Sequence, residues 1–162
     1  MIFLGLDASS AVTGWAIMEA TDKRNIKLIG SGEIKLSTFK KKAFPLEYVL
    51  MLHLALSTVI KRYKPEICYI EDIYYRRNQI TFKSLARIRG ICELACLINN
   101  IKLVVALSVS EVRNKVLGSG KLEKHEVCAI MEQRFNVSLA SDGFDKSDAV
   151  LMALAGVKEF YV

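Results

Sequence analysis

Short apolar runs recur along the chain between polar segments, and their lengths and periods predict five strands. Residues 1–7 (MIFLGLD) form an apolar run of the length expected for a buried strand. The segments 13–20 and 25–36 follow, and the alternation of apolar and polar residues in the second predicts a strand half exposed to water. The two last predicted strands are the short runs 66–71 and 101–107.

Longer segments with apolar residues at helical spacing predict helices between and after these strands. The sequence from Ser108 to Glu111 has the spacing of a capping box, so it predicts the start of a short helix that ends at Gly118. The predicted helices cover residues 44–63, 80–99, 108–118, 122–135 and the segment from Asp145 onward.

This order of elements predicts an α/β fold with a mixed five-stranded sheet flanked by helices. Strands one to three form an antiparallel meander, and strands four and five are added in parallel through helical crossovers. The expected strand order is 3-2-1-4-5, with strand two antiparallel to its neighbours, which is the ribonuclease H-like order. We expect residues 1–162 to form one domain.

The composition is that of a globular protein with a basic surface. The 23 basic and 17 acidic residues give a net charge of +6 and a pI of about 9.2, which favours a polyanionic partner. No segment approaches the ~20 apolar residues of a membrane span, and the first ten residues lack the basic start of a signal peptide. We therefore expect a cytoplasmic protein without a membrane partner.

Small residues mark one face of the predicted helix 80–99. Gly90, Cys92, Ala95 and Cys96 recur there at close spacings. Small residues let helices approach closely, so this face predicts either a dimer interface, centred on Gly90 and Cys92, or packing against the sheet. All four cysteines lie on apolar faces without C-x-x-C spacing, which predicts buried reduced thiols.

Four acidic residues stand where the predicted buried elements begin or end. Asp7 and Glu71 each close a strand, whereas Asp145 and Asp148 open the last helix and, three residues apart, share one face of it. Strands one and four are predicted neighbours, so these carboxylates meet at one sheet edge and repel one another unless cations bind. Carboxylates without His or Cys suit Mg²⁺ or Mn²⁺ rather than zinc. Taken singly, Asp145 could favour a helix N-terminus and Glu71 could pair with an arginine.

Five segments in order resemble the RuvC-type Holliday-junction resolvases, particularly the compact bacterial and phage members. GLDASSAVTGWAI resembles the first-strand motif of that family, and IEDIYYRRN resembles the motif with a glutamate at the strand end. SLARIRGICELAC is similar to its helix with an Arg-Gly pair, SEVRNKVLGSGKLEKHEV to its basic segment, and DKSDAVLMALA to its C-terminal acid pair. The resemblance covers nearly the whole chain.

The resemblance implies a homodimeric, Mg²⁺-dependent endonuclease that cuts Holliday junctions and other branched DNA by symmetric paired nicks. It implies no small-molecule substrate. Two Mg²⁺ ions per site, which Mn²⁺ can replace, would serve two-metal hydrolysis to 5′-phosphate and 3′-hydroxyl ends. The catalytic and metal-binding acids fall on Asp7, Glu71, Asp145 and Asp148, with Lys124 as a further catalytic residue, Arg113 at the rim and Tyr74 near the branch point.

The sequence departs from the family pattern at two positions. Ser9 occupies a turn where many members have glycine, so it adopts that turn without the conformational freedom of glycine. Arg113 replaces a lysine that is common in the family, which keeps the charge but changes its geometry.

Further DNA contacts are predicted from aromatic and basic residues outside the acidic cluster. Tyr74 lies close to Arg76 and Arg77 in the loop after Glu71, a combination suited to stacking on unpaired bases and binding phosphates. Ordinary surface tyrosines would look the same. Lys121 and Lys124 lie in a glycine-containing segment that could contact phosphates or could be a plain surface loop, and Lys83 adds a charge on helix 80–99.

Three other functions remain open from the sequence. A non-catalytic junction-binding protein would keep the basic surface, but four acids would then be unexplained. An ATP-binding module of the actin and sugar-kinase group shares the opening strand with its Gly-x-Asp, but it needs a second lobe of similar size. Another ribonuclease H-like nuclease would act on RNA hybrids, flaps or forks. A Mg²⁺-dependent cutting assay and nucleotide calorimetry discriminate among them.

Overall fold

The computed structural model describes residues 1–9, 11–36, 46–74, 78–139 and 143–162. Five strands form one sheet, and each lies within a few residues of its predicted segment. Their bounds are Ile2–Ala8 (β1), Val12–Ala20 (β2), Ile26–Lys35 (β3), Ile67–Glu71 (β4) and Leu103–Leu107 (β5).

The strand order β3-β2-β1-β4-β5 confirms the predicted topology. The first three strands pair antiparallel, and β4 joins β1 and β5 in parallel. Because β1 and β4 are parallel neighbours in which Leu6 pairs with Ile70, the residues that follow each of these, Asp7 and Glu71, lie at the same end of the sheet.

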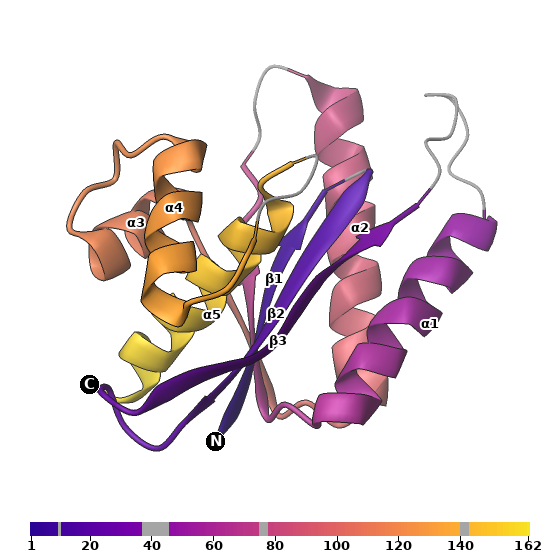
Figure 1. Cartoon of the computed structure of the whole chain (residues 1–162). Coiled ribbons are helices and arrows are strands. Elements are labelled where there is room, and N and C mark those ends of the chain that lie inside the picture. Colours follow the sequence, from indigo (N-terminus) through magenta and orange to yellow (C-terminus); the bar gives the residue numbers. More distant parts are fainter. Residues whose placement is uncertain (10, 37–45, 75–77, 140–142) are drawn as a thin grey trace.

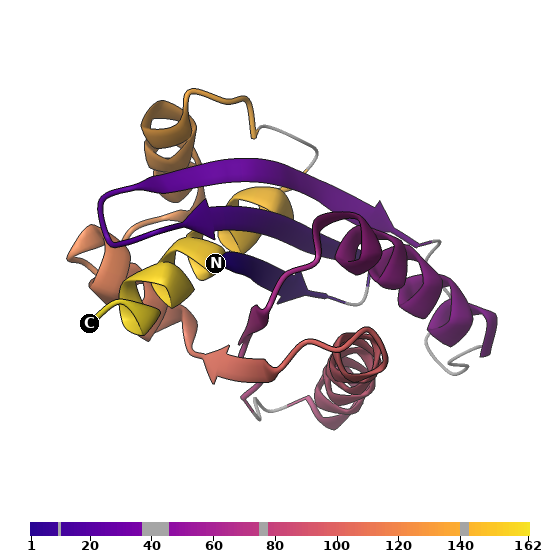
Figure 2. The same ribbon diagram turned by 90° about the horizontal axis from the view of Figure 1, so that it is seen from below.

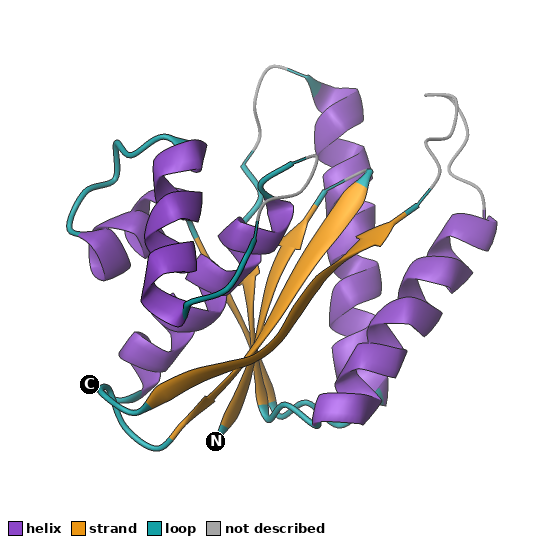
Figure 3. Ribbon diagram, viewed as in Figure 1, coloured by secondary structure: helices purple, strands orange, loops and turns teal. Residues whose placement is uncertain are grey.

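Five helices cover the sheet in two groups (Figures 1 and 3). Figure 2, seen from below, shows α1 and α2 on one side and α3, α4 and α5 on the other. The start of the predicted helix 44–63 falls partly outside the described residues. The helices are Leu46–Tyr63 (α1), Gln79–Ile98 (α2), Val109–Leu117 (α3), Lys124–Phe135 (α4) and Asp145–Phe160 (α5).

The alternation of side chains along each strand produces two hydrophobic cores. On β1, Leu4 and Leu6 face α1 and α2, whereas Phe3 faces the core shared with α5. Helix α5 lies very close to the sheet: a Cβ on Gly5 would stand 2.3 Å from the carbonyl oxygen of Ala149. Only glycine at this strand position permits such an approach.

The structure corrects the predicted dimer face on α2. Cys92 and Ala95 are completely buried in the core beneath α1 and α2, so their side chains cannot contact a second chain, although Gly90 is exposed. The small residues therefore serve packing within the chain. All four cysteines are free and buried, as predicted. Within the described residues, no helix is both long and apolar enough to cross a bilayer.

Candidate functional site

Two strand ends and one helix start bring the four predicted acids together. Asp7 pairs in the β1–β2 register with Gly14, and a Cβ on Gly14 would lie 2.0 Å from the carbonyl oxygen of Asp145. The missing side chain of Gly14 thus lets the first turn of α5 lie against the strand beside Asp7. Sequence patterning alone did not indicate this contact.

The first turn of α5 presents two carboxylates. The amide of Asp148 donates to the carbonyl oxygen of Phe144 at 2.8 Å, and the Ser147 hydroxyl donates to the same oxygen at 2.9 Å. Asp145 and Asp148 both lie in this turn, where the helix dipole favours negative side chains. Local helix structure therefore stabilises an acidic pair that would be unfavourable elsewhere.

The acids line a single cavity of about 680 Å³ at this end of the sheet. Two basic side chains, Arg113 from α3 and Lys124 from the start of α4, line the same cavity. Seven residues predicted from the sequence as site residues thus line one cavity: Asp7, Glu71, Tyr74, Arg113, Lys124, Asp145 and Asp148.

Burial raises the pKa of two of these carboxylates, Asp7 and Asp145. Asp7 is only 6% exposed, and its burial raises its pKa well above the usual value. The negative charge of Glu71 and a hydrogen bond with it raise the pKa of Asp7 further, as do the charges of Asp148 and Asp145. Burial also raises the pKa of Asp145, although Lys124 acts in the opposite direction. A cation at this position would relieve the repulsion.

An ammonium group already stands among these acids. Lys124 Nζ lies 2.8 Å from Asp148 Oδ2, with side chains that are 54% and 15% exposed, respectively. Burial acts to lower the pKa of Lys124, but the bond to Asp148 and the charges of Asp7 and Asp145 raise it above its ordinary value. The lysine therefore remains charged and compensates part of the acidic charge.

The donor atoms fit a hard divalent cation. All four candidate ligands are carboxylates, which suit Mg²⁺ or Mn²⁺. Within the described part of the chain, no three His, Cys, Asp or Glu side chains converge tightly enough to coordinate one ion as they stand. Asp148 forms an ion pair with Lys124. Binding a metal at this site would require the carboxylates to lie closer together, and Lys124 would compete with the metal for Oδ2 of Asp148.

Arg113 is held by the segment that precedes α4. Its Nη1 donates to the carbonyl oxygen of Leu122 at 2.6 Å, which ties α3 to the segment just before Lys124. Its Nε is buried and has no hydrogen-bond partner among the described residues. An unpaired buried donor of this kind is costly.

The other predicted DNA contacts differ in how near they lie to the cavity. Tyr74 lines the cavity and is 59% exposed. Lys83 on α2 and Lys121 before α4 are exposed side chains outside the cavity wall. The predicted contacts Arg76 and Arg77 lie outside the described residues.

Sequence reasoning missed several residues of the cavity wall. Asp72, Asn78 and Phe82 line it beside the acids. Asn78 caps α2, because its Oδ1 accepts the amide hydrogens of Ile80 and Thr81. An Asn directly before a helical segment is an N-cap signal that was present in the sequence. The role of Asp72 depends on a partner 17 residues away and gave no sequence signal.

Comparisons with known proteins identify related sequences and related folds. A family model described as crossover junction endodeoxyribonuclease RuvC matches residues 3–156. The RuvC of Caldanaerobacter subterraneus subsp. tengcongensis is 32% identical over 96% of this chain and 88% of its own length. The RuvC of Koribacter versatilis is 30% identical over 95% and 90%, respectively.

Solved structures show the same fold. The structure of Thermus thermophilus RuvC in complex with a Holliday junction substrate aligns with a TM-score of 0.85 at 20% identity, covering 99% of this chain and 95% of that one. The yeast mitochondrial Holliday junction resolvase aligns with a TM-score of 0.59 at 13% identity, covering 96% and 77%, respectively. These likenesses confirm the ribonuclease H-like fold.

Proposed function

The chain belongs to the RuvC family of crossover junction endodeoxyribonucleases, and we propose that residues 1–162 form one nuclease domain that resolves Holliday junctions with the acids of the cavity. The observation that carries this proposal is the convergence of four carboxylates and two basic side chains on one cavity. This membership removes the nucleotide-binding alternative of the actin and sugar-kinase group.

Asp7, Glu71, Asp145 and Asp148 would hold two Mg²⁺ ions, which Mn²⁺ can replace. When bound, the ions would activate the attacking water and stabilise the leaving 3′ oxygen of the scissile phosphodiester. Asp7 would be the principal ligand, because the charges of all three other acids act on it and its side chain is nearly completely buried.

Lys124 and Arg113 would act on the phosphate rather than on the metal. The Lys124 ammonium, which contacts Asp148, would stabilise the phosphoryl oxygens, where negative charge develops during cleavage. Arg113 lines the same cavity, so its guanidinium offers a second positive charge there. Exposed Tyr74 could stack on a base displaced at the branch point. Products would carry 5′-phosphate and 3′-hydroxyl ends.

Resolution of a junction needs two opposed nicks, and each chain carries one acidic cavity. An isologous dimer supplies two sites related by the same two-fold axis as the junction. Apolar side chains exposed on α1 and α2 are the candidate contact surface, which we call the α1–α2 apolar face. It comprises Leu46, Leu50, Met51, Leu54, Leu94, Leu97 and Ile98.

The substitution Asp7→Asn tests the function. It preserves side-chain shape but removes the charge that a metal needs, so Mg²⁺-dependent cutting of a labelled four-way junction should fall to background. Junction binding without metal should persist or tighten because repulsion from phosphate decreases. Asp22→Asn, in an exposed turn far from the cavity, is the matched control.

The same assay identifies the substrate class. We expect cutting of four-way junctions in preference to forks, linear duplex and RNA–DNA hybrids. Preference for hybrids would instead indicate another ribonuclease H-like nuclease. An Asp7→Asn protein that cuts at more than about a tenth of the wild-type rate would exclude Asp7 from two-metal catalysis.

A further inference from the structure

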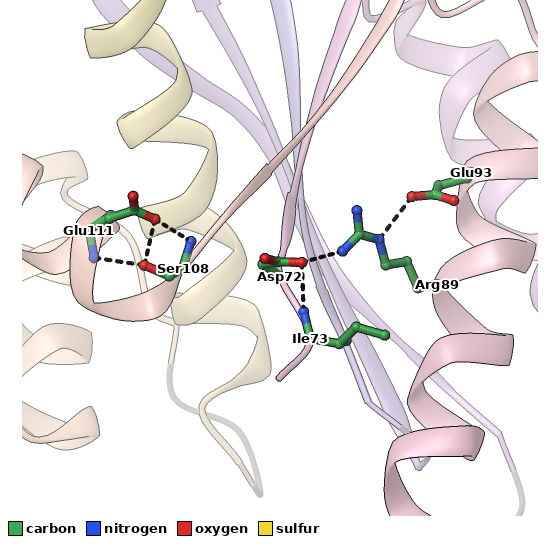
Figure 4. A network of polar contacts seen from close by, with 6 residues as sticks. All are labelled: Asp72, Ile73, Arg89, Glu93, Ser108 and Glu111. Atoms are coloured by element: carbon green, nitrogen blue, oxygen red, sulfur yellow. Dashed lines mark hydrogen bonds and ion pairs between the residues drawn. The ribbon is translucent and has the colours of Figure 1, made fainter. Parts of the chain in front are cut away.

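An arginine from the middle of α2 reaches the turn that follows Glu71 (Figure 4). Arg89 Nη1 donates to Asp72 Oδ1 at 2.5 Å, and its Nε donates to Glu93 Oε1 at 2.8 Å. The Arg89 side chain is only 21% exposed. Two nitrogens of one planar guanidinium thus hold two carboxylates in fixed directions.

Asp72 is fixed on three sides by these contacts. The same Oδ1 that binds Arg89 accepts the amide hydrogen of Ile73 at 3.0 Å. The amide of Asp72 donates to the carbonyl oxygen of Leu107 at 2.9 Å, which ties the turn to the end of β5. Glu71 is the covalent neighbour of Asp72, so the same contacts fix the backbone from which the Glu71 side chain extends.

The contact also controls charge at the cavity. Asp72 lines the cavity together with the four acids, so an unpaired Asp72 would be a fifth carboxylate beside a group that already repels itself. Arg89 offsets part of the charge of Asp72 and holds its Oδ1 on the α2 side (Figure 4). Glu71 is thereby left as the β4 carboxylate that is available to a metal.

We propose that Arg89 is a positioning residue that acts through Asp72 to hold Glu71 in its metal-binding orientation. This inference rests on the proposed role of Glu71 as a metal ligand. Arg89 does not line the cavity and so would not touch DNA phosphate or metal there. Groups that orient a metal ligand commonly change metal affinity or activity by about 10–100-fold when removed.

A positioning role and a simple charge effect of Arg89 make opposite predictions for how its removal changes metal binding. If Arg89 acted only as a nearby positive charge, its removal would strengthen the binding of a divalent cation, and removal of the Asp72 charge would weaken it. If Arg89 positions Glu71 through Asp72, both removals weaken binding, and removing both is no worse than removing one. The sign and the coupling therefore discriminate between the two explanations.

The experiment measures Mn²⁺ binding by calorimetry without DNA, using wild-type protein, Arg89→Gln, Asp72→Asn and the double variant. We expect about tenfold weaker Mn²⁺ binding for each single variant and the same loss for the double variant. The cleavage rate at saturating metal should fall in parallel, with the KM for junction DNA unchanged. Tighter Mn²⁺ binding by Arg89→Gln, or losses that multiply in the double variant, would overturn the proposal.

Matched variants separate positioning from general stability. Lys102→Gln breaks the ion pair with Glu66 at the opposite end of β4 and should leave Mn²⁺ binding unchanged. Arg89→Lys keeps the charge but cannot hold Asp72 and Glu93 with a rigid fork, so it should recover only part of the affinity. Thermal unfolding of every variant verifies that it is folded. Equal losses in Lys102→Gln and Arg89→Gln would assign Arg89 a merely structural role.

One further variant distinguishes failure of this inference from failure of the proposed function. Glu71→Gln removes the presumed ligand itself and should abolish most Mn²⁺ binding. If Glu71→Gln binds Mn²⁺ like the wild type, the metal site is wrong. If Glu71→Gln loses binding but Arg89→Gln does not, the metal site stands and Arg89 has no positioning role.

Discussion

At the scale of single residues, the cavity combines acids that repel one another with one lysine that offsets them. Lys124 bonds Asp148, and its charge also interacts with Asp7 and Asp145. A metal held by these acids would compete with Lys124 for Asp148. Lys124 thus offsets part of the same acidic charge that bound metals would offset.

Replacing Lys124 with alanine should therefore affect catalysis more than binding. Loss of one donor to developing charge commonly lowers turnover by about 10²–10³-fold, whereas loss of one phosphate contact changes junction affinity only modestly. Single-turnover cleavage and junction binding measured at the same salt concentration test this split. Lys121→Ala, on the same segment but outside the cavity wall, should change binding alone. Equal losses of rate and affinity in Lys124→Ala would make it a simple anchor.

At the scale of elements, the site depends on how closely α5 lies on the strands. Gly14 and Gly5 both stand where a Cβ would meet α5 backbone atoms. The contact at Gly14 involves the backbone of Asp145 itself, at the residue that pairs with Asp7. The distance between the strand acids and the helix acids is thus set by the absence of a side chain.

Gly14→Ala should separate the two halves of the acidic group. The new methyl group must push the first turn of α5 away from β2, and such overpacking typically costs about 1–3 kcal/mol of stability. We expect a lower melting temperature together with near-complete loss of Mg²⁺-dependent cutting. Gly90→Ala, where nothing lies within 4 Å of the new Cβ, is the control. It should stabilise α2 by up to about 1 kcal/mol and retain cutting.

The cap of α3 gives a pH-dependent contribution to stability. Ser108 Oγ accepts the amide hydrogen of Glu111, and a carboxylate oxygen of Glu111 accepts the amide hydrogen of Ser108. Hydrogen bonds from the Ser108 side chain and backbone lower the pKa of Glu111 from its ordinary value of 4.5. Because the pKa of Glu111 is lower in the folded chain than in the unfolded chain, its carboxylate stabilises the fold at pH values above the unfolded-state pKa. This stabilisation is lost as the pH falls through the folded-state pKa.

Glu111→Gln should therefore lower the melting temperature at neutral pH and have a smaller effect in acid. Glutamine can still accept the Ser108 amide but carries no charge. The measurement is thermal unfolding of both proteins at pH 7 and at about pH 3.5, below the ordinary value for a glutamate. If the difference in melting temperature between the two proteins stays constant or grows toward low pH, the ionised carboxylate has no such role.

The sequence predicted the elements and their order because apolar periods and turn residues act locally. The capping box at Ser108, the strand order and the position of Asp145 at a helix start were all confirmed. The orientation of α2 was not predictable, because it carries apolar residues on both sides: Cys92 and Ala95 face the core, whereas Leu97 faces outward. The contact of Arg89 with Asp72 likewise exists only in the folded chain.

At the scale of the whole molecule, the two faces of the sheet differ in what they leave exposed. The acidic cavity lies at the carboxyl ends of β1 and β4, where α5 begins. The α1–α2 apolar face lies on the helices that cover one side of the sheet, and it includes Leu46 at 81% and Leu97 at 71% exposed. Exposed apolar side chains on these two helices make them the candidate contact with another protein. A second copy of this chain would cover it and provide the second nick.

Leu97→Arg should convert a dimer into a folded monomer. A charge placed within an apolar contact disfavours association, while an exposed position tolerates the substitution within the chain. We expect sedimentation as a monomer, an unchanged melting profile at high dilution, and Mg²⁺-dependent single nicks without paired cuts. Ile130→Arg, an exposed apolar position on α4 on the opposite side of the sheet, should leave the dimer intact. Wild-type protein that remains monomeric both free and on junction DNA would contradict the dimer, because one cavity per chain could not then place two opposed nicks together.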